Sequence, residues 1–172
     1  GILKKLERME GLNIYPYSPH NKNDYSFNTN LPCIYTENVS LGLEHTKFDI
    51  RYNNAILKVS TSLVGSYYVD NILAVFGFLK AMGVEDKKIS YCLNNLTKIS
   101  GRMEVFRKEG FPTTVVDFGH NPDAIEKTLS TLKGLTQGNL FCVFVKQKVT
   151  QDDINAGLTT RPLGFEFAKQ TT

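Results

Sequence analysis

A strand, a tight turn and a helix start follow one another without a gap in T-T-V-V-D-F-G-H-N-P-D-A-I-E, residues 113–126. The β-branched and aromatic residues at its start are typical of a buried strand. The Asn121-Pro122 pair suits the N-cap and the first position of a helix. In α/β folds, ligands bind where a strand ends and such a helix begins. Asp117 and His120 are therefore candidate binding residues, and the amides and dipole of the helix start favour an anion beside them.

A second strand follows this helix in the near-continuous apolar run L-F-C-V-F-V, residues 140–145. Such runs are typical of strands that are buried on both faces of a parallel sheet. We therefore predict a right-handed βαβ unit over residues 113–145. The sequence then becomes polar and weakly periodic, so we predict that residues 146–172 form a divergent or disordered tail.

The earlier part of the chain begins with a short amphipathic pattern over residues 1–12, which predicts a helix. Apolar and polar residues alternate over residues 48–63, and Asn53-Asn54 in the middle suits a two-residue hairpin turn. The period then changes to that of a helix over residues 69–80 and again from Asp86. Strands and helices of this kind predict an α/β fold.

The composition excludes several functional classes. A net charge of +3 over 172 residues is too small to indicate a nucleic-acid partner. Apolar runs stay far below the ~18 residues that indicate a membrane span, so no membrane partner is expected. The three cysteines contain no C-x-x-C pair, which suits a reducing, cytoplasmic environment with Cys92 and Cys142 buried.

Two longer stretches resemble the Mur ligase family, and within it most of all the UDP-N-acetylmuramoyl-tripeptide synthetase branch. G-R-M-E-V-F, a turn and P-T-T-V-V-D-F-G-H-N-P-D-A-I-E-K-T-L resemble the start of the C-terminal domain of these enzymes. E-N-V-S-L-G-L-E-H-T-K-F-D-I and L-V-G-S-Y-Y-V-D-N-I-L-A-V resemble the end of their central ATP-binding domain. The resemblance implies that residues 1–97 end a central domain and that residues 98–145 begin an incomplete Rossmann-like C-terminal domain.

The same resemblance implies a fragment of an ATP-dependent ligase for peptidoglycan precursors. Mur ligases use ATP to activate a UDP-MurNAc-peptide as an acyl phosphate, which the amine of an amino acid then attacks. By resemblance, Arg102 reaches the nucleotide phosphates, where a cation is needed. Asp117 accepts hydrogen bonds from the ribose, His120 and Asn121 lie beside the nucleotide, and Asn71 contacts the adenine.

Each of these residues also has a structural alternative. Arg102 suits a surface salt bridge, Asp117 a cap at the strand end, His120 a turn position and Asn71 a packing or capping position on its helix. Tyr68 also departs from the family, which usually has a second Asn at that place.

The glycine-rich ATP loop, the Mg²⁺-binding Glu and the carbamylated Lys of the family have no counterpart in the sequence. We therefore expect the metal ligands outside this chain, and the chain alone to be inactive. Cyanophycin synthetase, folylpolyglutamate synthase and a non-catalytic truncated remnant stay open as alternatives.

Overall fold

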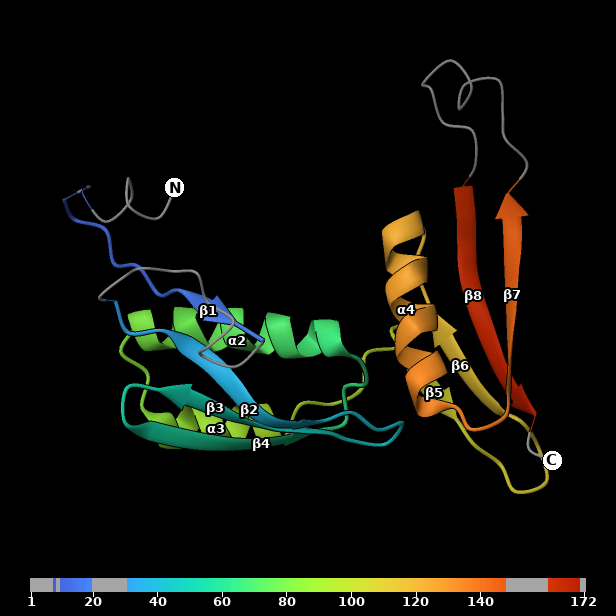
Figure 1. Ribbon diagram of the computed structural model, residues 1–172, viewed down its shortest axis with the longest axis horizontal. Helices are drawn as coiled ribbons and strands as arrows, with labels where there is room; N and C mark the ends of the chain where they lie inside the picture. The colour runs from blue at the N-terminus through green and yellow to red at the C-terminus, as the bar shows by residue number, and fades with distance from the viewer. Residues whose placement is uncertain (1–7, 9, 20–30, 148–160, 171–172) are drawn as a thin grey trace, which may run out of the picture. The chain divides into compact units, whose positions relative to one another are not determined.

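The computed structural model describes residue 8 and residues 10–19, 31–147 and 161–170 (Figure 1). These residues form two compact units, and the chain passes from the N-terminal unit to the C-terminal unit between Leu96 and Thr97. Two short connections, residues 42–44 and 63–65, are grouped with the C-terminal unit. The helix expected over residues 1–12 falls largely outside the described residues.

The N-terminal unit is a four-stranded sheet in the order β1-β2-β3-β4, accompanied by two helices. The predicted hairpin is confirmed as β3 and β4, and Asn53 in its turn has the positive φ, 53°, that such turns require. The two predicted helices are confirmed as α2 and α3. The bounds are β1 Tyr17–Ser18, β2 Ile34–Ser40, β3 Thr46–Tyr52, β4 Ala55–Thr61, α2 Ser66–Ala81 and α3 Asp86–Asn94.

The core of this unit lies between one face of the sheet and the two helices. Strand alternation buries one row of side chains, and the helices contribute a matching apolar row. The Asn94 side chain in α3 bonds to the backbone of β4. Its Nδ2 donates to the Lys58 carbonyl at 3.1 Å, and its Oδ1 accepts from the Ser60 amide at 2.8 Å, which fixes α3 to β4. The core residues include Phe48, Ile50, Leu57, Val59, Val69, Ile72, Leu73, Phe76, Ile89 and Leu93.

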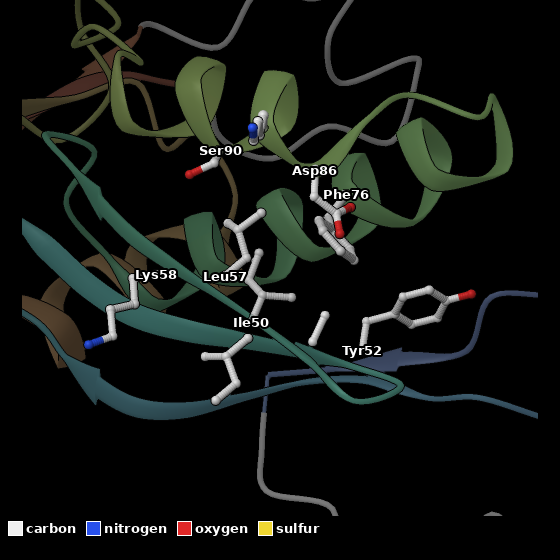
Figure 2. A pocket seen from close by; sticks show the side chains of 10 residues that line it. Ile50, Tyr52, Leu57, Lys58, Phe76, Asp86 and Ser90 are labelled. Atoms are coloured by element: carbon white, nitrogen blue, oxygen red, sulfur yellow. The ribbon is translucent and has the colours of Figure 1, made fainter.

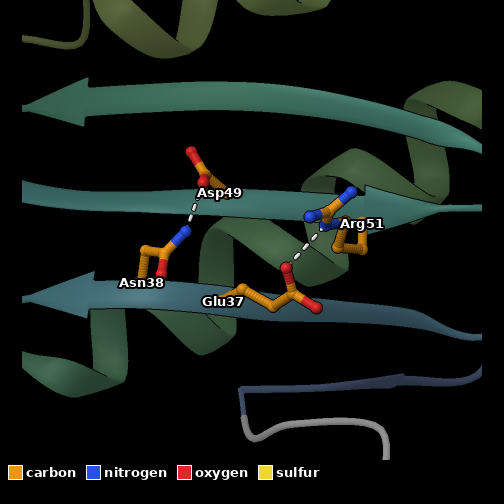
Figure 3. Close-up of polar contacts among 4 residues, drawn as sticks. All are labelled: Glu37, Asn38, Asp49 and Arg51. Atoms are coloured by element: carbon orange, nitrogen blue, oxygen red, sulfur yellow. Dashed lines mark hydrogen bonds and ion pairs between the residues drawn. The ribbon is translucent and has the colours of Figure 1, made fainter.

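The opposite face of the sheet carries polar pairs between β2 and β3, with the helices behind the strands (Figure 3). Arg51 pairs with Glu37 at 2.7 Å, and Asn38 donates to Asp49 at 2.8 Å. The first pair is half-buried and the second is exposed, and ion pairs open to solvent in this way add little stability, so the unit depends mainly on its buried face.

The C-terminal unit is a second sheet, in the order β5-β6-β8-β7, with the helix α4. The predicted strand–turn–helix segment is confirmed as β6 and α4. β8 lies between β6 and β7 and runs antiparallel to both. β6 and β7 therefore point the same way and are joined by α4, as in the predicted βαβ unit, but the antiparallel strand β8 lies between them, so the expected purely parallel sheet is wrong. The bounds are β5 Glu104–Phe106, β6 Thr113–Asp117, α4 Pro122–Leu135, β7 Asn139–Gln147 and β8 Arg161–Gln170.

Two further expectations for the end of the chain need correction. Residues 161–170 form β8 instead of a disordered tail, because backbone hydrogen bonds on both sides can hold a polar strand. Residues 148–160 lie outside the described residues. The apolar run of β7 is also less buried than predicted, since Phe141, Cys142 and Val143 are all exposed. Cys92 is exposed too, because the buried residues of α3 are Ile89 and Leu93.

A tight turn over residues 100–104, called the Arg102 turn below, leads into β5. Gly101 has φ +68°, and a Cβ at this position would lie 1.9 Å from Cε2 of Phe118. The Gly101 carbonyl accepts a 2.8 Å bond from the Phe118 amide. Glu104 closes the turn, because its Oε2 accepts from the Gly101 amide at 2.8 Å and from the Ser100 hydroxyl at 3.1 Å. Only glycine fits this backbone and this contact.

We predict that Thr46→Val raises the free energy of unfolding by about 1 kcal/mol. The Thr46 side chain is fully buried, and its hydroxyl has no hydrogen-bond partner within the described part of the chain. Thr36→Val is the matched control, because the buried Thr36 hydroxyl donates to the Pro19 carbonyl. This second change should lower stability. Urea unfolding of both variants measures the difference, and shifts in the same direction would contradict the prediction.

We predict that Gly101→Ala destabilises the chain more than Gly110→Ala does. Both glycines have positive φ, at +68° and +76°, but nothing lies within 4 Å of a Cβ at Gly110. Gly110→Ala should cost about 1 kcal/mol from backbone conformation alone. The extra cost at Gly101 comes from the Phe118 ring. Adding Phe118→Ala to both variants should therefore reduce the difference in stability between Gly101→Ala and Gly110→Ala. Equal melting temperatures for the two alanine variants would show that the ring contact carries no weight.

Candidate functional site

Four of the five predicted site residues lie in the C-terminal unit, around the end of β6. Arg102 lies at the surface in the turn before β5, and Asp117 is the last residue of β6. His120 and Asn121 lie in residues 118–121, called the His120 loop, which leads into α4. Asn71 lies on the exposed side of α2 in the N-terminal unit.

Asp117 is buried, with 4% of its surface exposed, and both of its carboxylate oxygens accept hydrogen bonds. Oδ1 accepts from the Met103 amide at 3.1 Å. Oδ2 accepts from the Gly119 amide at 3.1 Å and from the Thr128 hydroxyl at 3.0 Å. The carboxylate thus connects the Arg102 turn, the His120 loop and α4.

The backbone around Arg102 is held on both sides of this residue. Its own amide donates to the Ile99 carbonyl at 3.1 Å. Met103, the next residue, is buried and has φ +47°, which is unusual for a side chain larger than glycine. The bond from the Met103 amide to Asp117 stabilises that conformation. The Arg102 side chain therefore lies at the surface, on a backbone that is held by hydrogen bonds on both sides.

The His120 loop uses most of its hydrogen-bonding groups to hold itself. Asn121 caps α4 as predicted, because its Oδ1 accepts from the Ala124 amide at 2.8 Å. The Ile125 amide donates to the Asn121 carbonyl at 3.1 Å, and Pro122 has no amide hydrogen. His120 is exposed, with Nδ1 3.3 Å from the Phe118 carbonyl oxygen. The amides of Gly119 and Ala124 are therefore used within the fold, and Arg102 in the neighbouring turn is a permanently charged candidate for binding an anion.

The residues of this site suit an anion better than a metal ion. Three donors point at the Asp117 carboxylate, which is an arrangement that satisfies its oxygens and disfavours a cation there. Within the described ranges, no group of three or more His, Cys, Asp and Glu side chains could hold a metal. None of the helices described is long and apolar enough to cross a membrane.

A cavity of about 270 Å³ lies in the N-terminal unit, beside the β3–β4 hairpin and the start of α3 (Figure 2). Its apolar lining includes Ile50, Leu57 and Phe76. The Asp86 carboxylate at its rim forms a 2.7 Å ion pair with Lys80. None of the five predicted site residues lines this cavity, so it is separate from the candidate site.

The sequence analysis did not single out Thr128, Met103 and Glu104. Thr128 and the Met103 amide donate hydrogen bonds to Asp117, and Glu104 accepts one from the Gly101 amide. Thr128 is 2% exposed. A signal was present, because Thr128 lies four residues after Ala124 and four before the buried Leu132, on one face of α4.

A comparison with known protein families finds a match in the second half of the chain. Residues 101–163 match the family described as Mur ligase, glutamate ligase domain. Two relatives are named UDP-N-acetylmuramoyl-L-alanyl-D-glutamate–2,6-diaminopimelate ligase. The one from Janthinobacterium sp. (strain Marseille) is 36% identical, and 58% of this chain and 20% of the relative are covered. The one from Xanthomonas oryzae pv. oryzae is 38% identical, with 61% and 22% covered. The chain thus spans about a fifth of the length of these relatives.

A solved structure has a similar fold. The crystal structure of MurF from Acinetobacter baumannii superposes on the chain with a TM-score of 0.54. It is 20% identical, and the match covers 62% of this chain and 23% of that one. At this identity the match is evidence for the fold alone. Sequence therefore relates the matched part of this chain to Mur ligases, and the structural match shows a shared fold.

Proposed function

We propose that the chain is part of an ATP-dependent ligase that joins an amino acid to a UDP-MurNAc-peptide through an acyl phosphate, in peptidoglycan precursor synthesis. The names of the relatives support the reaction class. The single observation that carries the proposal is Arg102, which lies exposed on a turn fixed from beneath by Asp117. The reaction consumes ATP, which fits a cytoplasmic protein.

Arg102 is the proposed catalytic residue. ATP, when bound, supplies the phosphoryl group that activates the substrate carboxylate. The Arg102 guanidinium carries a permanent charge and a planar fork of donors, which match phosphate oxygens. Because its backbone is already ordered, little backbone conformational entropy is lost when Arg102 meets the phosphates.

The other residues of the site have supporting roles in this proposal. His120 and Asn121 lie beside the nucleotide, and Asn71 contacts the adenine. The contact of Asp117 with the ribose remains a prediction. A carboxylate has about four lone-pair positions. At Asp117, hydrogen bonds within the fold already occupy three of these positions. A ribose hydroxyl would therefore have to use the remaining position.

We place the Mg²⁺ ligands elsewhere in the complete enzyme. The Asp117 carboxylate is surrounded by donors, and the exposed charge of the site is the positive charge of Arg102. The substrate peptide and the amino acid likewise need groups that this part of the site does not offer. The proposed role of this segment is therefore to bind and orient the nucleotide phosphates.

We predict that the isolated 172-residue chain shows no ATP-dependent ligation, because the residues described here supply one part of a site. The measurement is phosphate release with ATP, UDP-MurNAc-dipeptide and a panel of amino acids that includes diaminopimelate. The full-length Xanthomonas relative is the positive control. Turnover by the isolated chain above the no-enzyme rate would contradict the prediction.

We predict that Arg102→Ala, in a complete ligase carrying this segment, lowers kcat roughly a hundredfold or more with an unchanged melting temperature. Loss of one charge-assisted contact in the transition state costs ~3 kcal/mol, at ~1.4 kcal/mol per decade of rate. Arg102→Lys should recover part of the rate, because Lys lacks the bidentate fork.

Arg107→Ala is the matched control, because Arg107 is also exposed and lies five positions further along the chain. It should keep the wild-type rate. Wild-type turnover in Arg102→Ala, or equal losses in the two alanine variants, would refute the role of Arg102.

A further inference from the structure

Thr128 makes a buried polar contact that the proposed function does not use. It lies in the second turn of α4, is 2% exposed, and donates its hydroxyl hydrogen to Oδ2 of Asp117 at 3.0 Å. Thr128 is too deeply buried to touch a nucleotide. Its only route to the site is through the carboxylate that it contacts.

The Asp117 carboxylate connects Thr128 to the residue that follows Arg102. One oxygen accepts from Thr128, and the other accepts from the Met103 amide at 3.1 Å. The Met103 amide belongs to the peptide bond between Arg102 and Met103. The orientation of that peptide bond sets the direction in which Arg102 leaves the backbone.

Met103 needs this support, because its φ of +47° is unfavourable for a residue with a side chain. A carboxylate that rotated about its own bonds would lose the Met103 amide. The hydroxyl of Thr128 and the amide of Gly119 together hold Oδ2, and so fix the rotation of the carboxylate.

We propose that Thr128 is a positioning residue for Arg102, acting through the Asp117 carboxylate and the Met103 amide. This inference rests on the proposed function for its consequence in catalysis. The structural part, the ordering of the Arg102 turn by a hydroxyl in α4, stands on the hydrogen bonds alone. The loss of a buried hydrogen bond to a carboxylate should raise the population of the locally opened Arg102 turn roughly tenfold.

Limited trypsin digestion of the 172-residue chain tests the structural part, because trypsin cuts the Arg102–Met103 bond whose amide Asp117 holds. Thr128→Val keeps the shape and removes the donor, whereas Thr128→Ser keeps the donor. Cleavage after Arg102, relative to cleavage after Lys133 in the same unit, should rise roughly tenfold in the Val variant and return toward wild type in the Ser variant. An unchanged ratio, or a Ser variant that behaves like Val, overturns the proposal.

The consequence for catalysis is tested in the complete ligase with the same two variants. Thr128→Val should lower kcat several-fold and leave the KM for the amino acid unchanged, and Thr128→Ser should restore kcat. A fall in kcat that Ser does not restore overturns the positioning role. If the complete protein shows no ATP-dependent ligation, the proposed function fails, while the trypsin ratio still decides whether Thr128 orders the turn.

Discussion

The order of the C-terminal unit depends on one buried carboxylate. Asp117 accepts hydrogen bonds from the Arg102 turn, which precedes β5, and from the His120 loop and α4, which follow β6. Because the side chain is almost fully buried, each donor that it loses would leave a polar group without a partner away from water, at a cost of about 1–3 kcal/mol. The three segments are therefore held in one arrangement at the end of β6.

Backbone strain is concentrated around the proposed catalytic residue. Gly101 and Met103, on either side of Arg102, both have positive φ, at +68° and +47°. Glycine adopts this conformation freely, but at Met103 it costs on the order of 1–2 kcal/mol. The hydrogen bond that the Met103 amide donates to Asp117 offsets that cost, and the bond that the Gly101 amide donates to Glu104 holds the other side of the turn. Strain that the surroundings hold in place is common where a side chain must be presented in one direction.

Local rules predicted the parts of the fold that depend on neighbouring residues. The Asn53-Asn54 turn, the Asn121 cap and the strand before it follow from backbone preferences a few residues long. The position of β8 between β6 and β7 depends on pairing between distant segments, which no short pattern contains. The burial of Thr128 was missed for a related reason, since its partner Asp117 lies eleven positions away. Local patterns in the sequence could suggest candidate site residues, but not the hydrogen bonds that hold them.

The proposed phosphate contact relies on a side chain as well as on a helix start. A helix N-terminus binds an anion through free amides, and here two amides near the start of α4 are already used, since Asn121 accepts from the Ala124 amide and Asp117 accepts from the Gly119 amide. A single exposed guanidinium attracts phosphate weakly in water, since solvent and salt screen it. It becomes effective when water is excluded around it. In the proposed function, this segment therefore depends on the rest of the enzyme to close over the nucleotide, and contributes a cation whose direction is already fixed.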